Sequence, residues 1–167
     1  QVMRFANAVI FNSHSAKDLY QSSVKNSKAF VIHNAVDSEK FQLPVKQSTA
    51  LREKFSIADD TKIIGVVARV DPMKGYSNLF LATFHLLKYR KDFVVLCVAS
   101  GSESEKSSLK QKCEMTGVAD HFIFLDPTDK LEFFYPQLDL LALTSSFGEG
   151  LPNVLIEAMA CGTKCVA

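Results

Sequence analysis

Short apolar runs alternate along the chain with longer segments in which apolar residues recur at helical spacing. Runs rich in Val, Ile and Phe are typical of strands buried on both faces, and the intervening segments fit helices that cover those faces. The alternation predicts an α/β fold, a Rossmann-like parallel sheet with helices on both faces. The predicted strands are residues 8–12, 29–33, 62–68, 93–99, 121–125, 139–144 and 164–167. The predicted helices are residues 15–24, 47–55, 75–90, 103–116, 129–136 and 152–161.

A polar segment interrupts this alternation after the second predicted strand. It is broken by Pro44 and has no strong period, which suits a crossing between two domains. We expect residues 1–34 to be the tail of an N-terminal domain, 35–55 to be the linker, and 56–167 to be most of a second domain. The chain starts with Gln and stops on the apolar run KCVA, so we expect a piece of a longer protein, truncated at its C-terminus.

The composition excludes several classes of function. The formal net charge of +1 gives no electrostatic footprint for nucleic acid. The longest apolar runs, such as FVVLCVA at 93–99, are much shorter than a membrane span. The four cysteines are too irregularly spaced for a disulfide framework or a zinc site, so we expect reduced thiols, a cytoplasmic location and no metal.

The first candidate site follows the third predicted strand. Open parallel sheets bind ligands at the carboxyl ends of their strands. There, the segment ARVDPMKG (68–75) places Arg69 and Lys74 on either side of a turn formed by Asp71 and Pro72. A guanidinium can hold two phosphate oxygens and an ammonium acts as a point charge, so the pair suits a diphosphate. The alternative is a solvated turn with two surface cations.

A second segment, SSFGEGLPN (145–153), leads from a predicted strand into the last predicted helix, with Pro152 expected at the first helical position and Gly162 just past the end. Gly150 carries no side chain, so backbone N–H groups near it can approach a ligand, and a helix N-terminus favours an anion. The alternative is a loop that only caps the helix. Neither GxxxxGK nor GxGxxG occurs, which argues against a P-loop or a dinucleotide-binding loop.

Two glutamates flank the start of this helix. Glu157 lies within an apolar stretch, where an unpaired carboxylate would be costly, so it must accept hydrogen bonds. Two adjacent ribose hydroxyls would satisfy both oxygens; the alternative is a salt bridge to Arg or Lys. Glu149 precedes the helix, at its positive end, which keeps the carboxylate ionised. It is then available to sugar hydroxyls or to developing positive charge; the alternative is helix capping.

In combination these motifs resemble a known family. R-x4-KG at Arg69, E-x7-E at Glu149 and Glu157, the following AMACG, and the linker HNAVDSEKF are similar to the retaining GT-B glycosyltransferases of family 4, also called glycosyl transferases group 1. The likeness extends over nearly all of the chain. It implies two Rossmann-like domains that face each other across a cleft, the second binding a nucleotide-sugar donor and the first, mostly upstream of Gln1, binding most of the acceptor.

The resemblance also assigns roles to residues. It places Arg69 and Lys74 on the donor diphosphate, Glu157 on the ribose and Glu149 on the transferred sugar, with Arg69, Lys74 and Glu149 as the catalytic set. The transfer it implies is retaining and needs no metal or other cofactor, because the leaving diphosphate helps to deprotonate the attacking hydroxyl. The segment that it implies cradles phosphate and sugar consists of Gly150, Leu151, Pro152, Asn153 and Val154.

Some positions depart from the family pattern. Ala35, Ala68 and Ala99 stand where Gly is frequent, and Lys164 replaces a common Pro. Asp126 also stands where Gly is frequent, and it leaves open which nucleobase, that of UDP, GDP or ADP, is bound.

The histidines are not assigned to the chemistry. The resemblance implies a catalytic histidine upstream of Gln1. We therefore expect His14 and His33 to be structural, and His85 and His121 to be ordinary helix and strand-start residues.

The sequence thus predicts a hexosyltransferase that moves sugar from a nucleotide-diphosphate-sugar to a hydroxyl acceptor. The motifs VARVDPMKG and EGLPNVLIEAMACG are similar to those of subgroups that build bacterial surface polysaccharide, O-antigen, capsule or lipopolysaccharide. This resemblance implies a saccharide or lipid-linked acceptor. It also implies peripheral contact of the full-length protein with the inner membrane. The alternatives are a GT-B epimerase, a glycogen-synthase-like enzyme, and a non-catalytic nucleotide-sugar-binding module.

Overall fold

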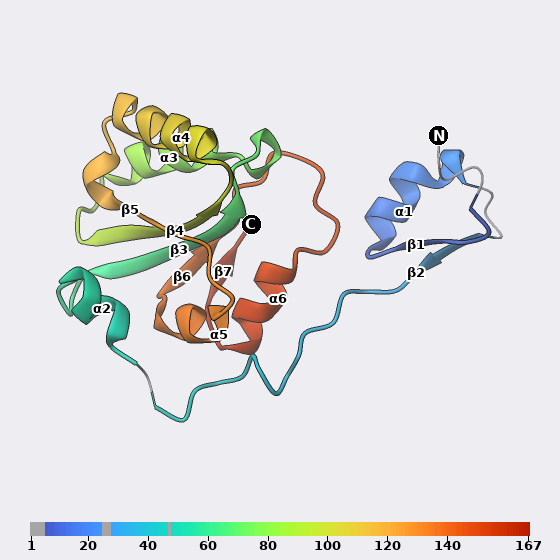
Figure 1. Ribbon diagram of the computed structural model, residues 1–167, viewed down its shortest axis with the longest axis horizontal. Coiled ribbons are helices and arrows are strands. Elements are labelled where there is room, and N and C mark those ends of the chain that lie inside the picture. The colour runs from blue at the N-terminus through green and yellow to red at the C-terminus, as the bar shows by residue number, and fades with distance from the viewer. Residues whose placement is uncertain (1–5, 25–27, 47) are drawn as a thin grey trace.

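A computed structural model describes residues 6–24, 28–46 and 48–167. Its strands form two parallel sheets, a two-stranded sheet with the order β1-β2 and a five-stranded sheet with the order β5-β4-β3-β6-β7 (Figure 1). The strands are β1 (Val9–Phe11), β2 (Ala29–Val31), β3 (Lys62–Arg69), β4 (Phe93–Ser100), β5 (Phe122–Leu125), β6 (Leu140–Ala142) and β7 (Cys165–Val166). The α-helices are α1 (His14–Tyr20), α2 (Ala50–Phe55), α3 (Tyr76–Leu86), α4 (Glu103–Met115), α5 (Leu131–Phe134) and α6 (Asn153–Ala160). Short 3-10 helices are η2 (Gln21–Ser23), η4 (Pro72–Lys74), η5 (Ala119–His121) and η6 (Tyr135–Gln137).

The five-stranded sheet separates two hydrophobic cores. Successive side chains of β4 point to opposite faces. Val95 and Cys97 therefore pack into the core under α3 and α4, whereas Leu96 and Val98 pack into the core under α5 and α6 (Figure 1). Because both faces are buried, the strand shows a continuous apolar run in the sequence. The predicted α/β class with helices on both faces is confirmed.

Each predicted strand and helix is present in the described part of the chain, with ends that differ by a few residues; residue 47, the predicted start of one helix, lies outside the described residues. The predicted helix at 129–136 is divided into α5 and η6, because Pro136 has no N–H to continue an α-helix. Pro152 is the N-cap residue of α6 and Asn153 its first residue, so Pro152 stands one position earlier than predicted. Its φ of −70° and ψ of 124° show the reason: the backbone is still extended there. Gly162 follows the helix with a φ of +78°, as its predicted place after the end requires.

The segment between β2 and α2 packs against the five-stranded sheet domain. Phe41 is buried in the core with Tyr135, and the two ring centroids lie 6.1 Å apart. Farther along, Leu43 lies so close to Gly162 that a β-carbon there would be 2.4 Å from its Cδ2 atom. The segment is therefore a packed crossing, although its assignment as an interdomain linker stays a prediction.

Within the residues described, none of the helices combines the length and the apolar character that a membrane crossing requires.

Candidate functional site

The predicted site residues lie on two chain connections at one edge of the five-stranded sheet. The connection from β3 to α3 carries Arg69 and Lys74, and the connection from β6 to α6 carries Glu149. Strands β3 and β6 are parallel neighbours, paired at Ile64 with Leu140. Both connections therefore leave the sheet side by side at its carboxyl edge, where parallel sheets bind ligands.

Hydrogen bonds join these two connections. Ser146 N donates to Met73 O at 2.8 Å, and Thr144 Oγ1 donates to Lys74 O at 3.2 Å. Gly75 has a φ of +63°, and a β-carbon there would lie 1.9 Å from Thr144 O, so this close approach requires glycine. The turn before it is fixed by Asp71, whose Oδ1 accepts a 2.8 Å hydrogen bond from Met73 N. The segment ARVDPMKG thus forms a rigid turn that is held against the second connection.

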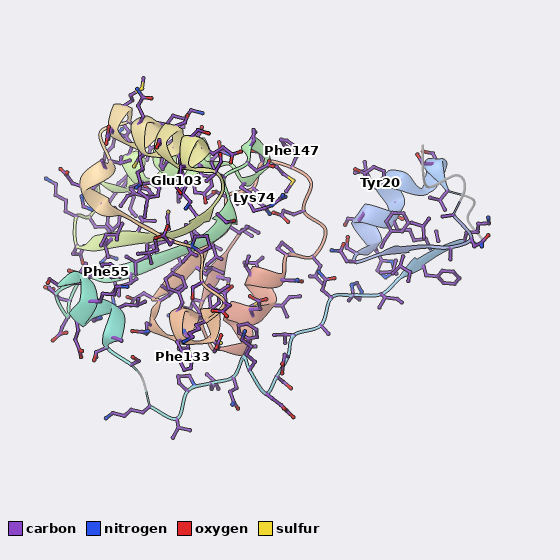
Figure 2. All side chains as sticks on the ribbon, viewed as in Figure 1. Tyr20, Phe55, Lys74, Glu103, Phe133 and Phe147 are labelled. Atoms are coloured by element: carbon purple, nitrogen blue, oxygen red, sulfur yellow. The ribbon has the colours of Figure 1, made fainter. Side chains whose placement is uncertain are left out.

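Lys74 and Glu149 are brought together in an ion pair. Lys74 Nζ and Ser145 Oγ both donate hydrogen bonds to Glu149 Oε1, the latter at 2.6 Å. The side chains of Lys74 and Glu149 are only 16% and 23% exposed, and Figure 2 shows Lys74 on the turn beside the loop that carries Phe147. Among the described residues none donates to Glu149 Oε2, and none accepts from the other two N–H groups of Lys74.

The surroundings keep Glu149 ionised. Burial by itself would raise the pKa of this carboxyl, but the hydrogen bonds from Lys74 and Ser145 and the charge of Lys74 lower the pKa by more, so it lies below its ordinary value. The predicted ionised state of Glu149 is therefore supported by two donors that the sequence reasoning did not pair with it.

Arg69 is the last residue of β3, and its side chain is exposed. It makes no side-chain hydrogen bond with the residues that the structure describes. Its backbone is fixed by β4, because Arg69 pairs with Ser100 in the strand register. The guanidinium thus starts at the sheet edge that also carries Lys74, and its predicted contact with a diphosphate stays a prediction.

The loop from Gly150 to Asn153 contacts the N-terminal segment. A β-carbon at Gly150 would lie 2.2 Å from Asn12 Oδ1, so the side chain missing at Gly150 makes room for Asn12. The side chain of Asn34 donates from Nδ2 to Leu151 O and to Asn153 Oδ1, both at 2.7 Å. Of the predicted cradle, Leu151, Pro152 and Val154 are half-buried and Asn153 is exposed, at the beginning of α6.

Glu157 accepts a hydrogen bond from a tyrosine rather than from Arg or Lys. Tyr135 is fully buried, and its hydroxyl donates to Glu157 Oε2 at 2.8 Å. Burial and this hydrogen bond raise the pKa of Tyr135, so the hydroxyl keeps its proton and remains a donor. No described residue donates to Oε1 of Glu157. The salt-bridge alternative does not occur among the described residues, and contact with a ribose stays a prediction.

The remaining candidates from the sequence lie outside this cluster. Asp126 is exposed at the end of β5, and its Oδ1 lies 3.3 Å from Lys106 Nζ. His33 Nδ1 lies 3.0 Å from Asn12 O, and the rings of His14 and His33 are 5.7 Å apart. His85 lies in α3 and His121 in η5, immediately before β5, as predicted.

A cavity of about 540 Å³ lies behind the turn, between α3 and α4. Its lining includes Asp71, Gly75, Ser108, Lys112 and Ser146, but neither Lys74 nor Glu149. The cavity therefore shares a wall with the candidate site without containing its charged pair.

Three contact residues were missed by the sequence reasoning: Ser145, Tyr135 and Asn34. Ser145 stands four residues before Glu149, and Tyr135 is hidden in the apolar run LEFFYPQ. Asn34 lies 117 residues from Leu151 in the chain, so no local pattern links them. Only its place in the linker motif HNAVDSEKF marked it.

The parallel sheet with helices on both faces is Rossmann-like, and the comparisons with known proteins agree with this fold. Residues 47–167 match the family model for Glycosyl transferases group 1. The chain belongs to this family, as the sequence resemblance predicted.

Relatives in sequence and solved structures extend the likeness. The D-inositol 3-phosphate glycosyltransferase of Mycobacteroides abscessus is 30% identical over 100% of this chain and 38% of its own length. The putative glycosyltransferase EpsF of Bacillus subtilis is 25% identical over 87% of this chain and 37% of its own. Anabaena HepE in complex with UDP and glucose superposes with a TM-score of 0.83 at 25% identity, over 99% of this chain and 45% of that one. The chain thus spans less than half the length of each.

Proposed function

We propose that this chain is the donor-binding part of a retaining glycosyltransferase, which transfers a hexose from a nucleotide-diphosphate-sugar to a hydroxyl acceptor. The observation that carries the proposal is the half-buried pair of Lys74 and Glu149 at the carboxyl edge of the sheet, with Glu149 on the loop that leads into α6. A cation, an ionised acid with one open oxygen, and a helix N-terminus together suit a sugar bound through a diphosphate.

The proposed chemistry places positive charge where the leaving group becomes negative. As the bond from the anomeric carbon to the diphosphate breaks, charge grows on the diphosphate, and Lys74, Arg69 and the N–H groups at the start of α6 stabilise it. Glu149 lies beside Lys74 and faces the sugar, whose ring becomes positive in the same step. A diphosphate oxygen accepts the proton of the attacking hydroxyl on the same face, which gives retention without a metal.

UDP-sugars are the first donors to test. Anabaena HepE has been solved with UDP and with UDP-glucose, and the second complex superposes with a TM-score of 0.84 at 25% identity. For the acceptor we propose a growing bacterial surface polysaccharide or its lipid-linked precursor, reached at the inner membrane. The relatives named for D-inositol 3-phosphate favour a second candidate, an acceptor that carries a phosphate on a cyclic polyol.

The test uses the full-length protein with labelled UDP-, GDP- and ADP-hexoses, with saccharide and inositol phosphate acceptors, and with and without EDTA. We expect one donor to transfer its label with retained anomeric configuration, read by NMR, and EDTA to have no effect. Loss of transfer in EDTA would contradict the metal-free step. An epimerised nucleotide-sugar without transfer would identify an epimerase. Extension of a glucan primer would identify a glycogen-synthase-like enzyme. Nucleotide binding without turnover would identify a non-catalytic binding module.

A further inference from the structure

The loop that leads into α6 is held by residues from the other sheet. Asn34, which follows β2, uses both N–H groups of its amide, one for Leu151 O and one for Asn153 Oδ1, each at 2.7 Å. These contacts hold the backbone carbonyl before Pro152 and the side chain of the residue after it, where the first helical N–H groups begin. The direction in which those groups point therefore depends on where Asn34 stands.

Asn34 is positioned by the joined ends of β1 and β2 in the two-stranded sheet, here called the frame, which consists of Phe11, Asn12, Ile32 and His33. Ile32 N donates to Phe11 O at 2.9 Å, and the ring of His33 lies within 3.0 Å of Asn12 O. The ends of β1 and β2 are thereby joined. Asn12, on the same frame, fills the space beside Gly150, since a β-carbon there would lie 2.2 Å from its Oδ1 atom.

This contact is polar and small, which separates it from ordinary core packing. Asn34 is half-buried, whereas Gly150 and Asn153 are exposed, and none of the three belongs to the buried clusters under the sheets. One of the two neutral hydrogen bonds is partly buried and the other is exposed, and such bonds add little to folding stability because water replaces them in the unfolded chain. The contacts fall on the four residues between Glu149 and the body of α6, where the proposed function places phosphate and sugar.

We propose that Asn34 is a positioning residue for donor binding, which aims the N–H groups at the start of α6 at the terminal phosphate of the nucleotide. This inference rests on the proposed function and adds a specific residue outside the five-stranded domain. It predicts that Asn34 governs how much the second phosphate of a nucleoside diphosphate contributes to binding, and leaves the binding of nucleoside and first phosphate unchanged.

The test measures dissociation constants by calorimetry on the full-length protein. Wild type is titrated with UDP, GDP and ADP, and the tightest binder is compared with its monophosphate. We expect Asn34→Ala to reduce the preference for diphosphate over monophosphate about tenfold, which corresponds to about 1.4 kcal/mol. Asn34→Asp should reduce it further, because a carboxylate would face two oxygen acceptors. The melting temperature of Asn34→Ala should stay within about 2 °C of wild type, because the two hydrogen bonds add little to folding stability.

The matched control is Asn78→Ala. Asn78 Nδ2 donates to Ser146 Oγ at 3.0 Å, so it also binds the connection from β6 to α6, but from within the same domain and away from the start of the helix. We expect the preference of Asn78→Ala for diphosphate over monophosphate to remain within twofold of wild type. An equal loss in both variants, or an unchanged preference in Asn34→Ala, would overturn the inference. If wild type binds none of the three diphosphates, the proposed function itself fails.

A second pair of variants tests the frame independently. Gly150→Ala should displace the loop, because its new methyl group would overlap Asn12, and should lower the same preference. Asn12→Ala removes the overlapping atoms, so the double variant should recover at least half of the loss. A double variant no better than Gly150→Ala would show that Asn12 does not support the loop.

Discussion

The carboxyl and amino ends of the five-stranded sheet each carry a carboxylate paired with a lysine, but only the carboxylate at the carboxyl ends has an oxygen without a donor among the described residues. At the carboxyl edge, Glu149 accepts from Lys74 and Ser145 through one oxygen, and none of the described residues donates to the other. At the amino edge, Asp139 uses both oxygens, one on Lys62 Nζ and one on the backbone N of Ile63, each at 2.9 Å. A carboxylate whose two oxygens both accept hydrogen bonds within the protein stabilises the fold. A carboxylate with one oxygen that accepts none, at the end of the sheet where ligands bind, is available to a substrate.

Both carboxyls have a pKa below the ordinary value, so the shift does not distinguish them. For Asp139, burial raises the pKa, while hydrogen bonds from Ile63 N and Lys62 and the charges of Lys62 and Arg52 lower it by more. The distinction lies in the position on the sheet and in the number of oxygens that remain open. Four predictions test it.

The largest effect is expected at the carboxyl edge. Glu149→Gln keeps the shape of the side chain and removes the charge opposite the developing positive charge of the sugar. We expect kcat to fall at least about 100-fold, the scale typical of a lost electrostatic contact in a transition state, with little change in melting temperature. Asp139→Asn is the control, and its kcat should stay within threefold of wild type. Transfer by Glu149→Gln at the wild-type rate would contradict the assignment.

Lys74→Ala should weaken binding of the nucleoside diphosphate by about 10-fold to 100-fold, because a hydrogen bond to a charged group contributes about 1.5–3 kcal/mol. The same change removes the partner of Glu149, whose pKa should rise towards its ordinary value. Calorimetry gives the affinity. Lys62→Ala, at the opposite edge, should leave that affinity unchanged, and an equal loss in both variants would mean that Lys74 acts only on folding.

Asp139→Ala should lower the free energy of unfolding by about 1–3 kcal/mol, because it leaves the N–H of the buried Ile63 without its acceptor. Urea denaturation of the full-length protein measures this loss. Asp92→Ala is the control: Asp92 pairs with Arg90 on the surface, and its removal should have no measurable effect. No difference between the two variants would show that Asp139 has no structural role.

The dependence on pH is the smallest effect. Folding lowers the pKa of Asp139, so its contribution to stability is complete above the ordinary aspartate pKa of about 4 and is lost as the pH falls through the lower folded pKa. The difference in unfolding free energy between wild type and Asp139→Asn should therefore be constant from about pH 5 to 7 and shrink below about pH 4. A difference that grows on acidification would contradict the direction of the shift.

The sequence by itself determined the order of elements and the family. The apolar runs at β3 and β4 are continuous because both faces of these strands are buried, and such a run is visible without coordinates. The predicted positions of Arg69, Lys74, Glu149 and Glu157 followed from motif spacing, which is also local. Even so, local rules left an error of one residue at Pro152, because a proline favours both the first helical position and the extended residue before it.

Only the tertiary structure decided which partners these residues have. Glu149 meets Lys74 because β3 and β6 are neighbours, although 75 residues separate the two side chains in the chain. Tyr135 reaches Glu157, and Asn34 reaches the start of α6, across different elements in the same way. A periodic pattern reports which side of an element is buried, but not which distant side chain lies opposite, because that depends on strand order and on how the crossing segment returns. For this reason the sequence predicted the charged residues of the candidate site, and the fold supplied the contacts that orient Lys74, Glu149 and Glu157.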